Sequence, residues 1–272
     1  IAFVYPIIVL WGTAILILLV APLTRREGTT QVPAVVALLG VLAALAVLIR
    51  RTQVSFGTTL FAGALLSDTL STAAAFVLLV AGMLAVLISQ SYLRARSLEK
   101  PEYYAILLLS LSGAYIMVLA DDLLVLFLGL ELMSFGFYVL AGFERTSSRS
   151  AEAALKYFLT GAFASALLVY GIMLTYAFAG GTSFEAVQAG VARGALKRPV
   201  GFAAVMLLLT GLGFKVAAVP FHQWLPDVYE GSPTSAVGFF AATAKIGAFA
   251  ALIRVLDILA AGSSVWLPAL RA

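Results

Sequence analysis

Ionisable side chains lie inside long apolar runs of this sequence, and these are the residues that could do chemistry. The set comprises Glu131, Lys156, Lys215, His222 and Lys245, and His222 is the only histidine in the chain. A charged group at membrane depth costs several kcal/mol unless it has a partner, water or a function. Carboxylates, amines and imidazoles take up and release protons, so their placement suggests a path for charge.

A structural role is the alternative for each of these residues. A lysine can lay its stem along apolar surface with its head at the interface, or it can pin two helices together through an ion pair. Glu131 could be the structural partner of one lysine, and His222 could be a hydrogen-bonded packing residue. Residue type alone leaves both roles open.

One stretch, GLGFKVAAVPFHQWLPD at 211–227, combines a lysine, two prolines and the histidine within an apolar run. Pro220 has no N–H, so the carbonyl of Val216 loses its usual helical partner and a helix break is expected there. In lipid, such a break is tolerated only where neighbouring protein or water satisfies the freed groups. The stretch therefore predicts that Lys215 lies beside an interrupted, hydrated helix centre.

The elements that position these residues are expected to be membrane-spanning helices. The chain is 62% hydrophobic and 11% charged, with a mean hydropathy of +1.07. Its apolar runs of about 20 residues suit helices that cross a hydrocarbon core, whereas barrel strands would alternate in polarity. We predict an all-α, polytopic transmembrane helix bundle in a single membrane domain, 1–272, with a discontinuous seventh helix. Its eight predicted spans are 1–22, 32–50, 69–92, 103–120, 122–143, 151–179, 199–229 and 233–258.

Two connections between the predicted spans are long, 51–68 and 180–198, and they should lie on the same side if every span crosses fully. The second has apolar residues at helical spacing, which predicts a short interfacial helix. Asp121 and Asp122 form a very short connection and suit the start of a helix. A slight excess of basic residues in the loops of one side favours an N-terminus outside the cell.

Composition also restricts the chemistry. The chain has no cysteine and one histidine, so it offers no thiolate ligands for iron–sulfur clusters and no pair of histidines for haem. We therefore expect no cofactor or metal in this chain. Its net charge of +4 is spread between the apolar runs, which argues against nucleic-acid binding.

Three stretches resemble the antiporter-like proton-channel subunits of respiratory complex I (NADH:quinone oxidoreductase, NDH-1), and among these the subunit N family. They are PFHQWLPDVYEGSPT at 220–234, FLGLELMSFGFYVLAGF at 127–143 and EAALKYFLTGAFASALLVYG at 152–171. The resemblance implies a 14-helix antiporter-like fold with two inverted repeats. Residues 1–120 would then be N-terminal helices and 121–258 the first repeat, with the second repeat expected beyond Ala272.

The same resemblance implies roles for individual residues. Glu131 matches the fifth-helix glutamate, Lys156 the sixth-helix lysine, Lys215 the broken-helix lysine, Lys245 the eighth-helix lysine, and His222 the histidine of the motif. The implied function is proton translocation coupled to quinone reduction in other subunits, with Lys215 as the central site and Glu131 as its modulating partner.

The implied surroundings are an energy-transducing inner membrane, with other complex I membrane subunits and membrane lipid as partners. FMN, iron–sulfur clusters and quinone are expected in partner subunits. Two alternatives are a subunit of a multi-component Na⁺/H⁺ antiporter and a structural membrane scaffold whose ion pairs only fix helix packing.

Overall fold

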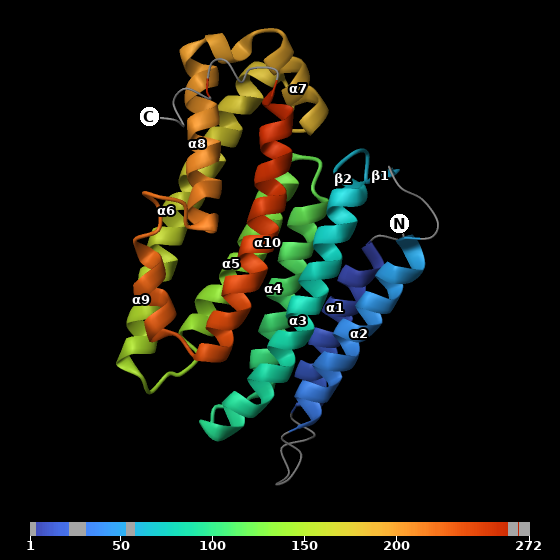
Figure 1. The fold of residues 1–272 in the computed structure, drawn as a ribbon, viewed down its shortest axis with the longest axis vertical. Helices are drawn as coiled ribbons and strands as arrows, with labels where there is room; N and C mark the ends of the chain where they lie inside the picture. Colours follow the sequence, from blue (N-terminus) through green and yellow to red (C-terminus); the bar gives the residue numbers. More distant parts are fainter. Residues whose placement is uncertain (1–3, 22–30, 53–57, 261–265, 267–272) are drawn as a thin grey trace.

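The protein is a bundle of long helices that lie side by side (Figure 1). A computed structural model describes residues 4–21, 31–52, 58–260 and 266. The elements in chain order are α1 (Tyr5–Val20), α2 (Val32–Thr52), β1 (Thr58–Leu60), β2 (Leu65–Ser67), α3 (Thr69–Ala95), α4 (Pro101–Leu119), α5 (Leu123–Ala141), α6 (Ser148–Ala179), α7 (Phe184–Ala192), η2 (Ala195–Lys197), α8 (Pro199–Val216), α9 (Trp224–Gly231) and α10 (Thr234–Ile258).

The predicted all-α membrane bundle is confirmed. Within the described ranges, seven helices are long and apolar enough to cross a membrane, namely α2 to α6, α8 and α10, whereas α1 is apolar but has 16 residues. Seven of the eight predicted spans each match one helix within a few residues, and the outer ends of the first span lie outside the described residues. The predicted span 199–229 is two helices, α8 and α9, which confirms the discontinuous seventh helix.

A short hairpin differs from the purely helical prediction. Strands β1 and β2 pair antiparallel within the predicted connection 51–68. The turn between them has Phe61, Ala62 and Gly63 at positive φ of 53°, 55° and 90°, which reverses the chain in few residues. Strands of three residues are too short to leave an alternating pattern in the sequence.

The hairpin, the corner between α4 and α5, and the start of α7 meet at one end of the bundle, in the upper part of Figure 1. Asp122 caps α5 as expected, because its carboxylate accepts a 2.8 Å hydrogen bond from the Leu124 N–H. The other oxygen of the Asp122 carboxylate accepts a 2.7 Å bond from Thr182. Helix α7 lies within the connection predicted to hold a short helix, and its place at a membrane interface stays a prediction.

Helix α4 lies at the centre of the bundle and packs against α1, α3, α5 and α10. Its backbone comes closest to that of α5, where Gly113 and Gly129 face each other. A Cβ at Gly113 would lie 2.8 Å from the Gly129 carbonyl oxygen, and a Cβ at Gly129 would lie 2.7 Å from the Met117 nitrogen. The glycines let the two backbones touch, and this contact fixes the depth of Glu131, two residues farther along α5.

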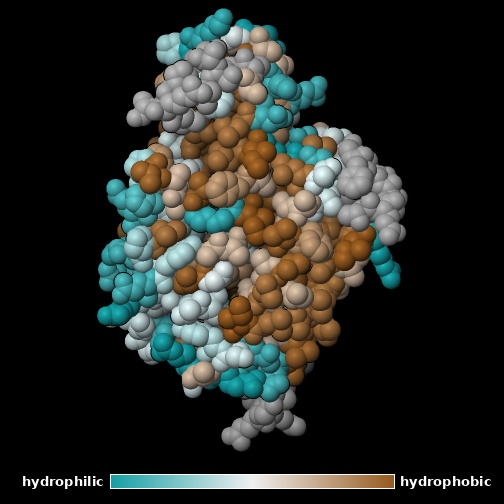
Figure 2. All heavy atoms as spheres, viewed as in Figure 1, coloured by the Kyte–Doolittle hydropathy of each residue, from teal (hydrophilic) through white to brown (hydrophobic). Residues whose placement is uncertain are grey.

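The outer surface has the distribution expected of a membrane protein. Large apolar side chains such as Leu19, Leu39 and Phe163 are more than half exposed. In Figure 2, hydrophobic residues cover the region over α1 to α3, whereas hydrophilic residues gather at the two ends and along the edge where α9 lies. An exposed apolar band between polar ends suits contact with lipid.

Candidate functional site

Lys215 lies in the last turn of α8, directly beside the helix break. The helix ends because Ala217 adopts a left-handed conformation with φ of 57°. The N–H of Ala218 then donates a 2.9 Å hydrogen bond to the carbonyl of Gly213, which satisfies one of the final carbonyls of the helix. Pro220 lies within the segment 217–223 that separates α8 from α9.

The Lys215 ammonium lies among aromatic rings. The residue is 2% exposed, and its Nζ lies 5.5 Å from the ring centre of Tyr138 and 5.3 Å from that of Tyr157. Among the described residues, neither this Nζ nor the two tyrosine hydroxyls has a hydrogen-bond partner. Cation–π attraction to the rings offsets only part of the cost of burying an amine.

Trp224, the first residue of α9, completes this aromatic group from beyond the break. Its ring is parallel to that of Tyr157, with centres 4.7 Å apart and an interplanar angle of 4°. It also stacks on Phe214, with centres 5.1 Å apart. The contacts join the end of α8, the start of α9 and the first third of α6 around Lys215.

Glu131 approaches this group from α5. Its carboxylate accepts a short hydrogen bond from the hydroxyl of Ser165 on α6. Glu131 is close enough to Lys215 to interact with it electrostatically. Among the described residues, however, Glu131 and Lys215 do not form an ion pair within 4.0 Å. The carboxylate is therefore held by a neutral hydroxyl near the lysine.

Lys245 reaches the same helix break from α10. Its side chain is half-buried, and its Nζ donates a 2.5 Å hydrogen bond to the carbonyl of Val216, the last residue of α8. This is the carbonyl that the proline at position 220 deprives of its helical donor. Lys245 and Lys215 therefore both lie at the interrupted end of one helix.

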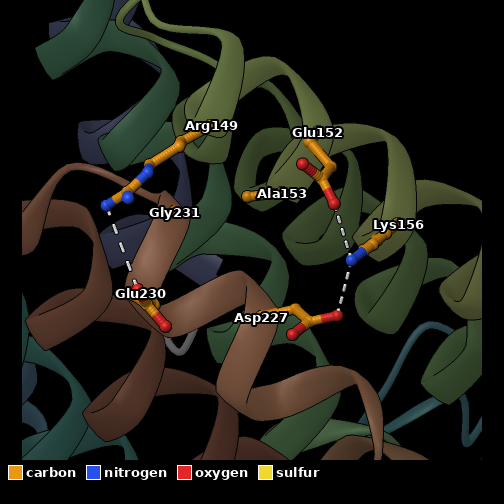
Figure 3. A pocket seen from close by; sticks show the side chains of 7 residues that line it. All are labelled: Arg149, Glu152, Ala153, Lys156, Asp227, Glu230 and Gly231. Atoms are coloured by element: carbon orange, nitrogen blue, oxygen red, sulfur yellow. Dashed lines mark hydrogen bonds and ion pairs between the residues drawn. The ribbon is translucent and has the colours of Figure 1, made fainter.

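Lys156 and His222 lie at the surface. Lys156 Nζ is 2.7 Å from a carboxylate oxygen of Glu152 on its own helix and 2.7 Å from one of Asp227 on α9 (Figure 3). His222 is exposed within segment 217–223, and its carbonyl accepts a hydrogen bond from the Leu225 N–H. Of the five predicted relay residues, Lys215 and Lys245 thus lie at the end of α8, whereas Glu131 bonds to Ser165 of α6.

A second charged group lies at the hairpin end of the bundle. Arg254 of α10 is 7% exposed and forms a 2.7 Å ion pair with Asp68, the residue that caps α3. Burial opposes ionisation of Asp68, but hydrogen bonds from Ser71 and the nearby guanidinium hold its pKa below the usual value. Burial raises the pKa of Asp121 in the same region.

Sequence reasoning missed the partners that come from other helices. Ser165, Tyr138, Tyr157 and Trp224 lie on three different helices, so no local spacing indicates that they meet. The Glu152–Lys156 pair is the kind of contact that a sequence can indicate, because residues four apart face each other on a helix. Within the described ranges, no group of three histidine, aspartate or glutamate side chains is arranged to hold a metal ion.

Comparison with known proteins supplies a family. Residues 120–270 match the family model described as NADH:quinone oxidoreductase/Mrp antiporter, TM. The chain is 50% identical over 185 residues to NADH-quinone oxidoreductase subunit N 1 of Sorangium cellulosum, an alignment that covers 66% of this chain and 36% of that protein.

Two solved structures have a similar fold. A chain of respiratory complex I from Thermus thermophilus with bound aureothin is 32% identical, with a TM-score of 0.74, and the match covers 92% of this chain and 52% of that one. A chain of the Mrp complex from Dietzia is 19% identical with a TM-score of 0.77, covering 98% of this chain and 50% of that one, and shows a shared fold. The chain spans about half the length of these relatives, or less.

Proposed function

The chain belongs to the membrane family that NADH:quinone oxidoreductase shares with Mrp antiporters, and from this premise we propose that it is subunit N of a proton-translocating NADH:quinone oxidoreductase. Its part is to move protons through the membrane while electron transfer takes place in other subunits. FMN, iron–sulfur clusters and quinone belong to those partners. The complex lies in an energy-transducing inner membrane, with the N-terminus of this chain outside.

One observation carries the proposal: the amine of Lys215 is buried beside a helix break without a hydrogen-bond partner in the described part of the chain. A structural lysine at membrane depth would have a carboxylate or a carbonyl against it. An amine without such a bond is free to gain or lose a proton as its surroundings change.

Glu131 is the group that changes those surroundings. A carboxylate about 4 Å from a lysine contributes roughly 4 kcal/mol at an effective dielectric constant of about 20. When Glu131 turns from Ser165 towards Lys215, the attraction holds a proton on the lysine. When Glu131 returns to the Ser165 hydroxyl, the buried ammonium loses its partner and releases the proton.

Lys245 is the next group on this route. Its Nζ already contacts the carbonyl of Val216. Val216 directly follows Lys215, so both amines lie at the same interrupted helix end. Water can bridge polar groups at such a break. Alternation of Glu131 between Ser165 and Lys215 then moves a proton from one amine towards the other.

The test is a Lys215→Met substitution in the full-length subunit of the assembled complex. Proton uptake into sealed vesicles is measured together with electron transfer to quinone, and the number of protons moved per electron is compared with the wild type. We expect a fall of at least twofold, because one proton-binding amine is lost. A wild-type ratio would contradict the proposal.

A matched control and a second assay separate the alternatives. Lys100→Met removes an exposed lysine just before α4 and should leave the ratio unchanged. Purification of the native assembly should yield flavin, iron–sulfur absorbance and inhibitor-sensitive quinone reduction. An assembly without them that exchanges sodium for protons would instead be an antiporter, and a variant altered only in stability would indicate a scaffold.

A further inference from the structure

Helix α9 depends on other helices for its position. It has eight residues, and a helix this short is not stable by itself in water. It packs closely on α6 at its C-terminal end, where a Cβ at Gly231 would lie 2.7 Å from the Arg149 carbonyl oxygen. Whatever holds α9 on α6 therefore also determines where Trp224 lies.

Two contacts join α9 to α6, one exposed and one buried. Lys156 Nζ lies 2.7 Å from Asp227 Oδ2 at the surface, and Tyr157 stacks on Trp224 in the interior. Lys156 and Tyr157 are neighbours on α6, while Trp224 and Asp227 are three residues apart on α9. The surface ion pair is thus one helical turn from the aromatic contact.

The aromatic contact leads directly to the amine of the proposed proton site. The Tyr157 ring that stacks on Trp224 also lies 5.3 Å from Lys215 Nζ. A displacement of α9 would move Trp224 away from Tyr157 and from Phe214, which precedes Lys215. The burial of the amine consequently depends on the position of α9.

We infer that Lys156 and Asp227 form a clamp between α6 and α9 that positions the aromatic residues around Lys215, with Lys156 keeping its proton throughout. The inference rests on the proposed function, because it assigns these two residues to the support of the same proton site. Glu152 is not part of the clamp. It lies 2.7 Å from the same Nζ but belongs to α6 itself, so it cannot hold α9.

The clamp and a relay role for Lys156 predict opposite effects of arginine. Arginine can bond both carboxylates but does not release its proton in proteins. Lys156→Arg therefore preserves a clamp and blocks a relay. Lys156→Gln removes the positive charge, so it should weaken a clamp and a relay alike.

The experiment measures protons moved per electron in the assembled complex with full-length subunit variants. Asp227→Asn and Lys156→Gln should each lower the ratio at least twofold, while Asp227→Glu and Lys156→Arg should stay close to the wild type. Glu152→Gln is the matched control, because it removes an equally short contact to the same lysine, and it too should stay close to the wild type.

Three results would overturn the inference. One is a loss in Lys156→Arg as large as in Lys156→Gln, which would make Lys156 a proton carrier. Another is a wild-type ratio in Asp227→Asn. The third is an equal loss in Glu152→Gln, which would indicate a general effect of surface charge. If Asp227→Asn fails to assemble, the two Lys156 variants decide, since both keep Asp227.

The outcome is separable from that of the proposed function. If Lys215→Met pumps normally, the proton site itself is wrong, whatever the clamp variants do. If Lys215→Met loses pumping while Asp227→Asn keeps it, only the clamp is wrong.

Discussion

Lys245 Nζ donates a 2.5 Å hydrogen bond to the carbonyl of Val216, so a side chain of α10 caps the interrupted end of α8. A lysine that satisfies a carbonyl at a helix C-terminus also interacts favourably with the helix dipole. The same residue is the proposed next proton acceptor after Lys215. Its structural and functional roles can be separated by substitutions that remove one and keep the other.

Lys245→Met should weaken both roles. A hydrogen bond from a charged group contributes about 1.5–3 kcal/mol, so the thermal midpoint of the purified complex should fall along with the protons moved per electron. Lys245→Arg should keep the cap and the midpoint but lose pumping, because arginine retains its proton. Normal pumping by Lys245→Arg would reduce Lys245 to a cap. Lys100→Met, which removes an exposed lysine, serves as the control.

Ser165→Ala should disturb coupling by releasing Glu131. A hydrogen bond to a charged group contributes about 1.5–3 kcal/mol, and without it Glu131 should remain turned towards Lys215. A bias of about 1.4 kcal/mol corresponds to a tenfold change in the balance between the two positions. We expect a several-fold slower rate of proton uptake with quinone reduction still sensitive to inhibitors.

The control for this change is Ser110→Ala on α4. The Ser110 hydroxyl donates to the Ile106 carbonyl within its own helix, so its loss should leave the rate unaltered. Equal rates in Ser165→Ala, Ser110→Ala and the wild type would show that the Ser165 hydroxyl does not control Glu131.

The helices and the position of the break could be predicted from the sequence because both depend on local features. Runs of apolar residues set the spans, and Pro220 removes a donor four residues after Val216 wherever the helix lies. Asp122 is a cap in any helix that starts beside it. These effects need no knowledge of the other helices.

The partners of the charged residues could not be predicted in the same way. Ser165 meets Glu131 across 34 positions of sequence, and Asp227 meets Lys156 across 71. The expected pairing of Glu131 with Lys215 stays a prediction, because the two do not form an ion pair within 4.0 Å among the described residues. Helix packing decides such contacts, and it depends on close approaches such as that of Gly113 to Gly129.

Gly161→Ala should displace the ring that covers Lys215. A Cβ at Gly161 would overlap the hydroxyl of Tyr138 and lie 2.8 Å from its Cζ, and a rigid ring can relieve this overlap only by moving as a whole. We expect at least a twofold loss of protons moved per electron. Gly238→Ala on α10, where a Cβ meets nothing within 4 Å, should pump normally. If Gly161→Ala and Gly238→Ala move equal numbers of protons per electron, the position of the Tyr138 ring does not affect pumping.

Asp68→Asn should destabilise the protein in a pH-dependent manner. Arg254 is buried and Asp68 is 33% exposed. Loss of the pair should therefore cost about 2 kcal/mol, somewhat below the range for fully buried pairs because water reaches Asp68. The folded-state pKa of Asp68 lies below its usual value of 3.8, so its contribution to stability is present above that pH and disappears as pH falls through the folded value.

The difference in thermal midpoint between the wild type and Asp68→Asn should accordingly be largest near pH 7 and shrink below pH 3.8. Glu230→Gln breaks an exposed pair with Arg149 and should change the midpoint little at any pH, whereas a constant difference across the pH range would mean that ionisation of Asp68 does not matter.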